Sequence, residues 1–151
     1  MKTPVVTTVL FIAVCLGGGL LIGINNIPGA WYQSLVKPSF NPPNWIFAPA
    51  WSILYVLIGI AGARTWLFAR RSPAMALWGL QLVLNFLWSP LFFGLQRPSL
   101  ALLVILPLLL VILAFITLVW NRDRPSALCF LPYAAWVAFA SLLNASIVAL
   151  N

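Results

Sequence analysis

Long apolar runs separated by short polar breaks make up most of this chain of 151 residues. Five of these runs reach the ~20 residues that a helix needs to cross the hydrocarbon core of a bilayer. We predict helices over residues 4–24, 46–69, 74–96, 100–120 and 126–150. The pattern therefore predicts an all-α fold, a single five-helix membrane domain over residues 1–151 with no room for a soluble domain.

Residues 25–45 interrupt this pattern, and we call them the lid. Pro38, Pro42 and Pro43 fix φ and remove backbone donors, so this segment is predicted to be a loop or a broken helix. Its tryptophans, tyrosine and phenylalanine would leave an apolar patch if they were exposed to water. We therefore expect the lid to fold over one end of the helix bundle and to cap a pocket within the membrane.

Composition supports a membrane protein. Hydrophobic residues make up 64% of the chain and charged residues 6%, with a mean hydropathy of +1.08, values that a water-soluble surface does not tolerate. The net charge of +7 comes from basic residues at the segment ends, where they set topology and contact anionic lipid, so we do not expect a nucleic-acid partner. Cys15 and Cys129 fall in apolar runs and are interpreted as buried hydrophobes. The chain has no histidine, which excludes a histidine-ligated haem or zinc site.

The positive charges predict an orientation. With five spans, Lys2, Arg64, Arg70, Arg71, Arg122 and Arg124 share the side of the N-terminus, whereas Lys37 and Arg97 lie on the other side. In a bacterial inner membrane the positive-inside rule places the N-terminus in the cytoplasm and the lid outside. An outer membrane remains an alternative, and there the rule gives no sidedness.

Three of the predicted helices carry a stripe of aromatic and amide residues. Amides facing lipid are costly, so these stripes are expected to face inward and to line one uncharged cavity. The alternative is that the amides hydrogen-bond between helices while the aromatics fill the core or the interfacial belts. The stripes are Trp51, Tyr55 and Gly62; Gln81, Asn85, Trp88 and Phe92; and Tyr133, Trp136, Ala140 and Asn144.

The residues that are missing limit the chemistry. The only acid, Asp123, lies between two arginines in a polar loop, so no carboxylate or histidine within the membrane serves a proton-driven pump or a conventional hydrolase. What remains is binding of a flat, hydrophobic molecule, stacked on tryptophans and oriented by amides. Lys37 or Arg97 at the rim would pair with a carboxylate of that molecule, although an ordinary lipid headgroup contact explains Lys37 equally well.

Several motifs follow one another along the chain. They are Trp31-Tyr32-x-x-Leu35-x-Lys37-Pro38, Pro42-Pro43, Pro49-x-Trp51-x-x-Leu54-Tyr55, the run from Gln81 through Asn85 and Trp88 to Gly94, and Pro132-Tyr133-x-x-Trp136-x-x-Phe139-Ala140 with Asn144. Together they resemble the tryptophan-rich sensory protein or translocator protein family (TspO/MBR), over essentially the full length and in order.

This resemblance implies a five-helix bundle, usually a homodimer, whose first loop covers a pocket for porphyrins such as protoporphyrin IX, with no cofactor required. Animal members also bind cholesterol, but this chain lacks their cholesterol motif near the end of the last helix, which weakens that expectation. Combined with the stripes, the resemblance gives the predicted ligand-binding residues. They are Trp31, Tyr32, Lys37, Trp51, Tyr55, Gln81, Asn85, Trp88, Phe92, Tyr133, Trp136, Ala140 and Asn144.

Three functions stay open at this point. The first is a tetrapyrrole-binding membrane protein acting as sensor, carrier or scavenger. The second, implied by the resemblance, is light-dependent porphyrin degradation with Trp51 and Trp136 as the reactive residues. The third is a regulatory or structural dimer, for which the small-residue run Ser141, Ala145 and Ala149 would allow close helix contact, although the same run would equally serve packing within one chain.

Overall fold

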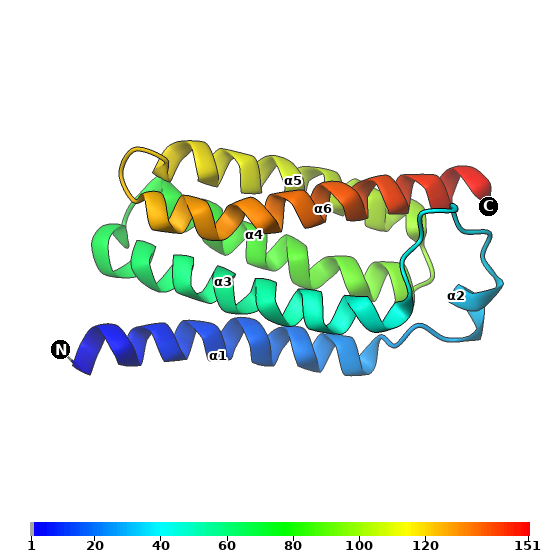
Figure 1. The fold of residues 1–151 in the computed structure, drawn as a ribbon, viewed down its shortest axis with the longest axis horizontal. Coiled ribbons are helices and arrows are strands. Elements are labelled where there is room, and N and C mark those ends of the chain that lie inside the picture. Colours follow the sequence, from blue (N-terminus) through cyan, green and yellow to red (C-terminus); the bar gives the residue numbers. More distant parts are fainter. Residues whose placement is uncertain (1) are drawn as a thin grey trace.

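The computed structural model describes residues 2–151, and every regular element in that range is a helix (Figure 1). Five helical segments are long and apolar enough to cross a membrane, which confirms the predicted all-α fold and its five spans. The long helices are α1 (Lys2–Asn25), α3 (Phe47–Ala69), α4 (Pro73–Ser89), α5 (Pro98–Val119) and α6 (Arg124–Leu150).

The third predicted helix ends earlier than expected. We predicted one helix to residue 96, but α4 ends at Ser89 and is followed by a wider helical turn, η2 (Pro90–Gly94), in which the Leu95 N–H donates to the Pro90 carbonyl at 2.8 Å. Pro90 has no N–H for the regular α-helical bond, and this explains the change of pitch. The segment then leaves the helix at Gln96, whose φ of 54° lies in the left-handed region.

The lid is mostly an irregular loop, one of the two alternatives that its prolines predicted. It contains the short helix α2 (Ala30–Ser34) and ends in the 3₁₀ turn η1 (Asn44–Ile46), which leads directly into α3. The Asn151 side chain holds its middle, because its amide accepts from the Val36 N–H at 3.0 Å and donates to the Val36 carbonyl at 2.9 Å. In Figure 1 the lid lies across the end of the bundle where α6 finishes.

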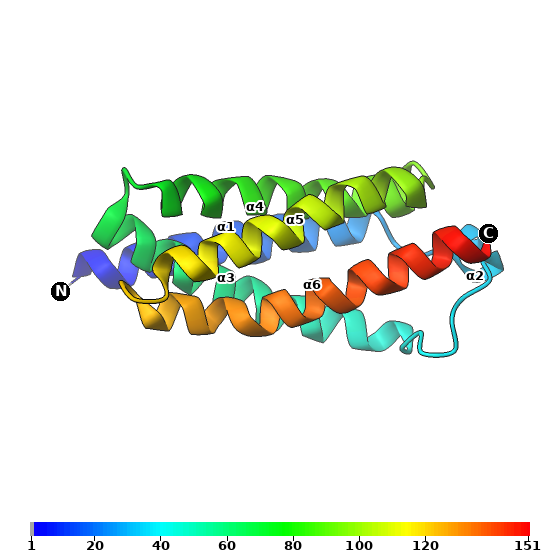
Figure 2. The ribbon, with the colours of Figure 1, turned by 90° about the horizontal axis from the view of Figure 1, so that it is seen from above.

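The helices form a closed bundle in which α3 packs between α1 and α6, and α5 packs between α4 and α6 (Figure 2). The backbones of α1 and α3 approach closely at Gly59, where an added Cβ would lie 2.6 Å from the Ile12 Cα. Gly19 and Gly23 of α1 have the spacing of a close helix contact, but Gly19 leaves room for the Tyr55 ring, and a Cβ added at Gly23 would meet nothing within 4 Å. Side-chain packing therefore explains Gly19 better than helix–helix contact.

One half of the bundle is densely packed. Phe115 on α5 and Phe130 on α6 are fully buried with ring centroids 4.3 Å apart, near the turn between their helices. Trp78 belongs to the same core and donates its indole N–H to the Ile58 carbonyl at 2.9 Å. Gly62 makes room for this indole, so its predicted place on the cavity stripe was wrong.

The charged residues gather at the ends, as the spans predicted. The N-terminus of α1, the α3–α4 turn and the α5–α6 turn lie at one end, and the lid lies at the other (Figure 1). The side chain of Lys2 lies outside the described part of the chain. Cys15 is buried, Cys129 is only partly buried, and both are free. The prediction that both are buried is therefore confirmed for Cys15 alone.

Candidate functional site

The half of the bundle beneath the lid contains a cavity of about 510 Å³, walled by α1, α3, α4, η2 and α6. We call it the main cavity. The predicted stripes of α3, α4 and α6 all contribute to it, so their expected convergence is present in the structure. Most of the predicted ligand-binding residues line it, namely Tyr32, Trp51, Tyr55, Asn85, Trp88, Phe92, Trp136, Ala140 and Asn144.

Four predicted residues do not line the main cavity. Trp31 packs against the edge of Phe92 at 6.0 Å between ring centroids, and Lys37 lies in a separate pocket on the lid. Gln81 and Tyr133 are fully buried behind the cavity wall, where the Tyr133 hydroxyl bonds to Asn85 and Gln81 and the Tyr133 ring packs on Trp51 at 6.4 Å. The structure thus gives the stripes two layers, one facing the cavity and one supporting it.

One wall of the main cavity is an aromatic corner formed by α3 and α6. Trp51 stacks on Tyr55 with ring centroids 5.5 Å apart and an interplanar angle of 30°. Trp136 stands almost perpendicular to Trp51, at 6.5 Å and 88°, and Phe47 packs on Trp136 at 5.9 Å. Such edge-to-face and offset contacts are the favourable aromatic geometries, so they fix the faces that the corner offers to a ligand.

The wall formed by α4 and η2 is also aromatic. Trp88 stacks on Phe92 at 5.1 Å, and Phe92 meets Phe93 at 4.7 Å. The indole N–H of Trp88 donates to Asn144 Oδ1 at 3.0 Å, and Asn144 Nδ2 in turn donates to the Pro98 carbonyl at 2.9 Å. These bonds tie α4 to α6 and hold the Trp88 ring in one orientation.

A chain of hydrogen bonds runs from the cavity wall into the bundle. The Tyr55 hydroxyl donates to Asn85 Oδ1 at 2.7 Å, Asn85 Nδ2 donates to the Tyr133 hydroxyl at 2.7 Å, and that hydroxyl donates to Gln81 Oε1 at 2.8 Å. Three helices share this chain, as expected where lipid offers no partner to a polar group. Both interpretations of the amides therefore apply, because Asn85 lines the cavity and also joins the helices.

The contribution of α1 to the cavity wall was not predicted from the sequence. Gly19, Leu20, Gly23 and Ile24 line the main cavity, together with Ile27 and Pro28 just after the helix. This helix has no polar stripe, so nothing distinguished its inward face from its lipid face. The one usable signal was Gly19, whose missing side chain admits the Tyr55 ring.

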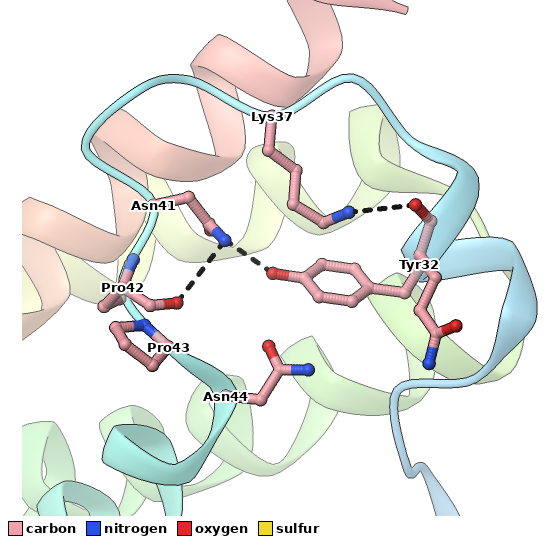
Figure 3. Close-up of a pocket in the computed structure, with 7 residues that line it drawn as sticks. Tyr32, Lys37, Asn41, Pro42, Pro43 and Asn44 are labelled. Carbon is pink, nitrogen blue, oxygen red and sulfur yellow. Dashed lines mark hydrogen bonds between the residues drawn. The ribbon is translucent and has the colours of Figure 1, made fainter.

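A second pocket, of about 390 Å³, lies within the lid, and we call it the lid pocket (Figure 3). Lys37 enters it with its ammonium 4.5 Å from the centre of the Tyr32 ring, and donates to the carbonyls of Gln33 at 3.4 Å and Leu35 at 3.2 Å. It is lined by Tyr32, Gln33, Lys37, Asn41, Pro42, Pro43 and Asn44.

Comparison with known proteins agrees with this architecture. The model of the TspO/MBR family matches residues 11–150. The chain belongs to the TspO/MBR family. It is 40% identical to the tryptophan-rich protein TspO of Chlorobaculum tepidum, over 95% of this chain and 97% of that protein. It is 45% identical to protein CrtK of Rhodobacter capsulatus, over 82% of this chain and 80% of that protein. It is 39% identical to the translocator protein of Ovis aries, over 95% of this chain and 89% of that protein.

Family membership and the five candidate spans make this TspO/MBR chain an integral, multi-pass membrane protein. The motifs that carried the resemblance also build the site. The run that begins at Gln81 forms the wall of α4 and η2, and the motif around Trp51 forms the aromatic corner.

The main cavity offers this TspO/MBR protein stacking faces rather than acid–base groups. Within the described part of the chain, none of its lining residues is charged. Its polar groups are amides and hydroxyls, several of them already paired with one another. A site of this kind binds through apolar contact and shape, with few directed hydrogen bonds.

Proposed function

We propose that this TspO/MBR protein binds tetrapyrroles such as protoporphyrin IX and similar flat hydrophobic ligands in the main cavity, acting as a sensor, carrier or scavenger. The observation that carries the proposal is an uncharged cavity of about 510 Å³ lined by Trp51, Trp88 and Trp136. Pockets of ~300–1,000 Å³ with mostly apolar walls are typical of small-molecule sites. Indole faces suit a flat conjugated ring because they stack on it.

The absence of histidine from the sequence bears on which tetrapyrrole is preferred. Without an imidazole, a haem iron in the cavity would lack its usual strong axial ligand. We therefore expect metal-free protoporphyrin to bind at least as tightly as haem. A clear preference for haem would contradict this part of the proposal.

Titration of the purified protein with protoporphyrin IX in the dark tests the binding proposal. Quenching of tryptophan fluorescence should saturate, and a Trp51→Ala variant should bind roughly tenfold more weakly, since it loses a stacking face and its buried area. Trp66→Ala is the matched control, because Trp66 lies on the same helix but outside the cavity. A linear response that is the same in all three proteins would overturn the proposal.

Light-dependent porphyrin degradation is a second candidate, favoured by the arrangement of Trp51 and Trp136. Both indoles line the main cavity and stand at 88° to each other, so one flat chromophore would contact both. Under illumination, bound porphyrin should give a new product, and Trp51→Phe or Trp136→Phe should slow its formation while leaving dark binding largely intact. Free porphyrin that bleaches at the same rate as the bound form would remove this candidate.

We further propose a bacterial inner membrane with the N-terminus in the cytoplasm and the lid outside. The support is that Arg64, Arg70, Arg71, Arg122 and Arg124 lie at the end opposite the lid. Reporter fusions to the N-terminus and to the lid should be active on opposite sides of the membrane. A cytoplasmic lid with the N-terminus outside would contradict the assignment.

A homodimer in the lipid bilayer remains a proposal that rests on family resemblance. In the small-residue run, Ser141 is buried within its own chain and donates to the Val137 carbonyl at 2.7 Å. Ala145 is partly buried and Ala149 is exposed. Burial of Ser141 supports the alternative that this run packs inside the bundle.

A further inference from the structure

Lys37 is a cation without a side-chain carboxylate to pair with. The chain has a single acidic residue, Asp123, and Arg64 binds that residue at the end of the bundle opposite the lid. Lys37 is partly buried in the lid, with its ammonium over the Tyr32 ring. A partly desolvated ammonium favours an anionic partner, so a ligand is the natural source of the missing charge.

The surroundings of the Lys37 ammonium are suited to an anion. Two of its three N–H groups are directed to the Gln33 and Leu35 carbonyls, which leaves one donor free. Asn44 and Asn41 line the same space (Figure 3). The Asn41 amide accepts from the Tyr32 hydroxyl and donates one N–H to the Pro42 carbonyl, each at 3.4 Å, so its second N–H is the one left for a ligand. The lid pocket therefore combines one positive charge with several hydrogen-bond donors, and no lining residue is negatively charged.

The lid pocket adjoins the main cavity. Tyr32 and Asn44 line both spaces, so a molecule that fills the main cavity and extends past these two side chains enters the lid pocket. Tyr32 is well placed at this junction, since its ring packs on Phe93 at 5.3 Å on the cavity side and under Lys37 on the lid side. An apolar chamber thus leads into a polar, cationic one.

We propose that the lid pocket is a carboxylate subsite of the main cavity, with Lys37 as its charged residue and Asn41 and Asn44 as its neutral donors. The ligand class is a flat apolar body that carries a carboxylate on a short flexible arm. The body stacks in the main cavity, and the arm passes Tyr32 and Asn44 to reach the ammonium. This inference rests on the proposed function and specifies which ligands that site prefers.

A pair of ligands that differ only in charge tests the subsite. Protoporphyrin IX and its dimethyl ester are titrated in the dark into the wild-type protein and a Lys37→Gln variant, reconstituted in nanodiscs. The wild type should bind the acid roughly tenfold more tightly than the ester, as a charge-assisted hydrogen bond in a partly exposed site predicts. Lys37→Gln should remove this preference by weakening the acid while leaving the ester unchanged.

Two further variants test whether Lys37 binds the carboxylate of the ligand or has another role, such as holding the lid or contacting a lipid headgroup. Arg97→Gln removes a positive charge at the same end of the bundle from a residue that lines neither space, and it should keep the preference for the acid. Lys37→Arg retains the charge and should keep most of the preference. If Lys37 only organises the lid or contacts a lipid headgroup, Lys37→Gln will change acid and ester binding equally.

Equal effects on the two ligands, or no preference in the wild type, would overturn the subsite while saturable binding still upheld the proposed function. If neither ligand binds saturably to the wild type, the proposed function and the subsite fail together. If the ester loses affinity in Lys37→Gln while the acid does not, the subsite is also rejected.

Discussion

Asp123 is the one acidic residue of the chain, and it forms an ion pair with Arg64. Its carboxylate accepts from Arg64 Nε at 3.1 Å and from the adjacent terminal nitrogen at 2.6 Å, and Ser126 Oγ also donates to it. Burial raises the pKa of this carboxyl, but the hydrogen bonds from Arg64 and Ser126 outweigh that effect, so the net pKa is lowered. The contact joins α3 to the start of α6.

The lowered pKa of Asp123 gives a pH dependence with a definite sign. Because folding favours the ionised carboxylate, its stabilisation is complete above the unfolded value of about 3.9 and is lost as the pH falls through the folded pKa. Asp123→Asn should lower the free energy of unfolding at pH 7 by about 1–2 kcal/mol, since Arg64 loses its charged partner. Thermal unfolding in detergent measures this, with the exposed Arg71→Gln as control.

The difference in stability between the two proteins should shrink as the pH falls below about 3.9, because the wild type then loses the stabilisation that the ionised Asp123 provides. A variant that unfolds at the wild-type temperature at pH 7 would show that this contact contributes nothing. Loss of stability in Arg71→Gln of the same size would assign the effect to net charge instead.

At the scale of elements, the lid is held to the bundle by side-chain hydrogen bonds and aromatic contacts. Asn151 at the end of α6 makes both hydrogen bonds to Val36, and Phe40 packs on Phe139 at 6.2 Å between ring centroids. A ligand reaching the main cavity from the lid side must pass this segment. Local opening of such a segment costs less than global unfolding.

Asn151→Ala should loosen the lid without unfolding the bundle. Asn151 makes two hydrogen bonds to Val36, and at about 1 kcal/mol each their loss corresponds to roughly thirtyfold faster amide exchange around Val36, measurable by hydrogen–deuterium exchange. Ser146→Ala is the control, because Ser146 bonds only to the Leu142 carbonyl of its own helix. Unchanged exchange at Val36 would mean that the aromatic contacts alone hold the lid closed.

The elements also show where sequence reasoning succeeds and fails. Apolar length located the five spans, because in lipid each helix must satisfy its own backbone. It misplaced the end of α4, where Pro90 imposes a wider turn. Amide and aromatic spacing found the cavity walls on α3, α4 and α6, but the wall on α1 has no polar marker. Gly62 was predicted to face the cavity but faces the Trp78 indole, because helical spacing alone does not distinguish a residue that lines a cavity from one that packs on a buried ring.

At the scale of the whole molecule, the bundle divides into a packed half and a hollow half. The half with the arginines is filled by side chains such as Phe115 and Phe130. The half beneath the lid keeps a cavity of about 510 Å³, although filling it with apolar side chains would gain buried contacts and stability. We therefore expect the main cavity to hold a ligand.

Protoporphyrin titration of an Ala140→Phe variant tests whether the ligand binds in the main cavity. Ala140 is buried and lines the main cavity, so a phenyl ring there takes up room that a tetrapyrrole needs, while apolar filling preserves the fold. The account predicts at least roughly tenfold weaker saturable quenching, with wild-type affinity retained in Ala114→Phe on the exposed face of α5. Undiminished binding to a folded Ala140→Phe protein would contradict the claim and place the ligand elsewhere.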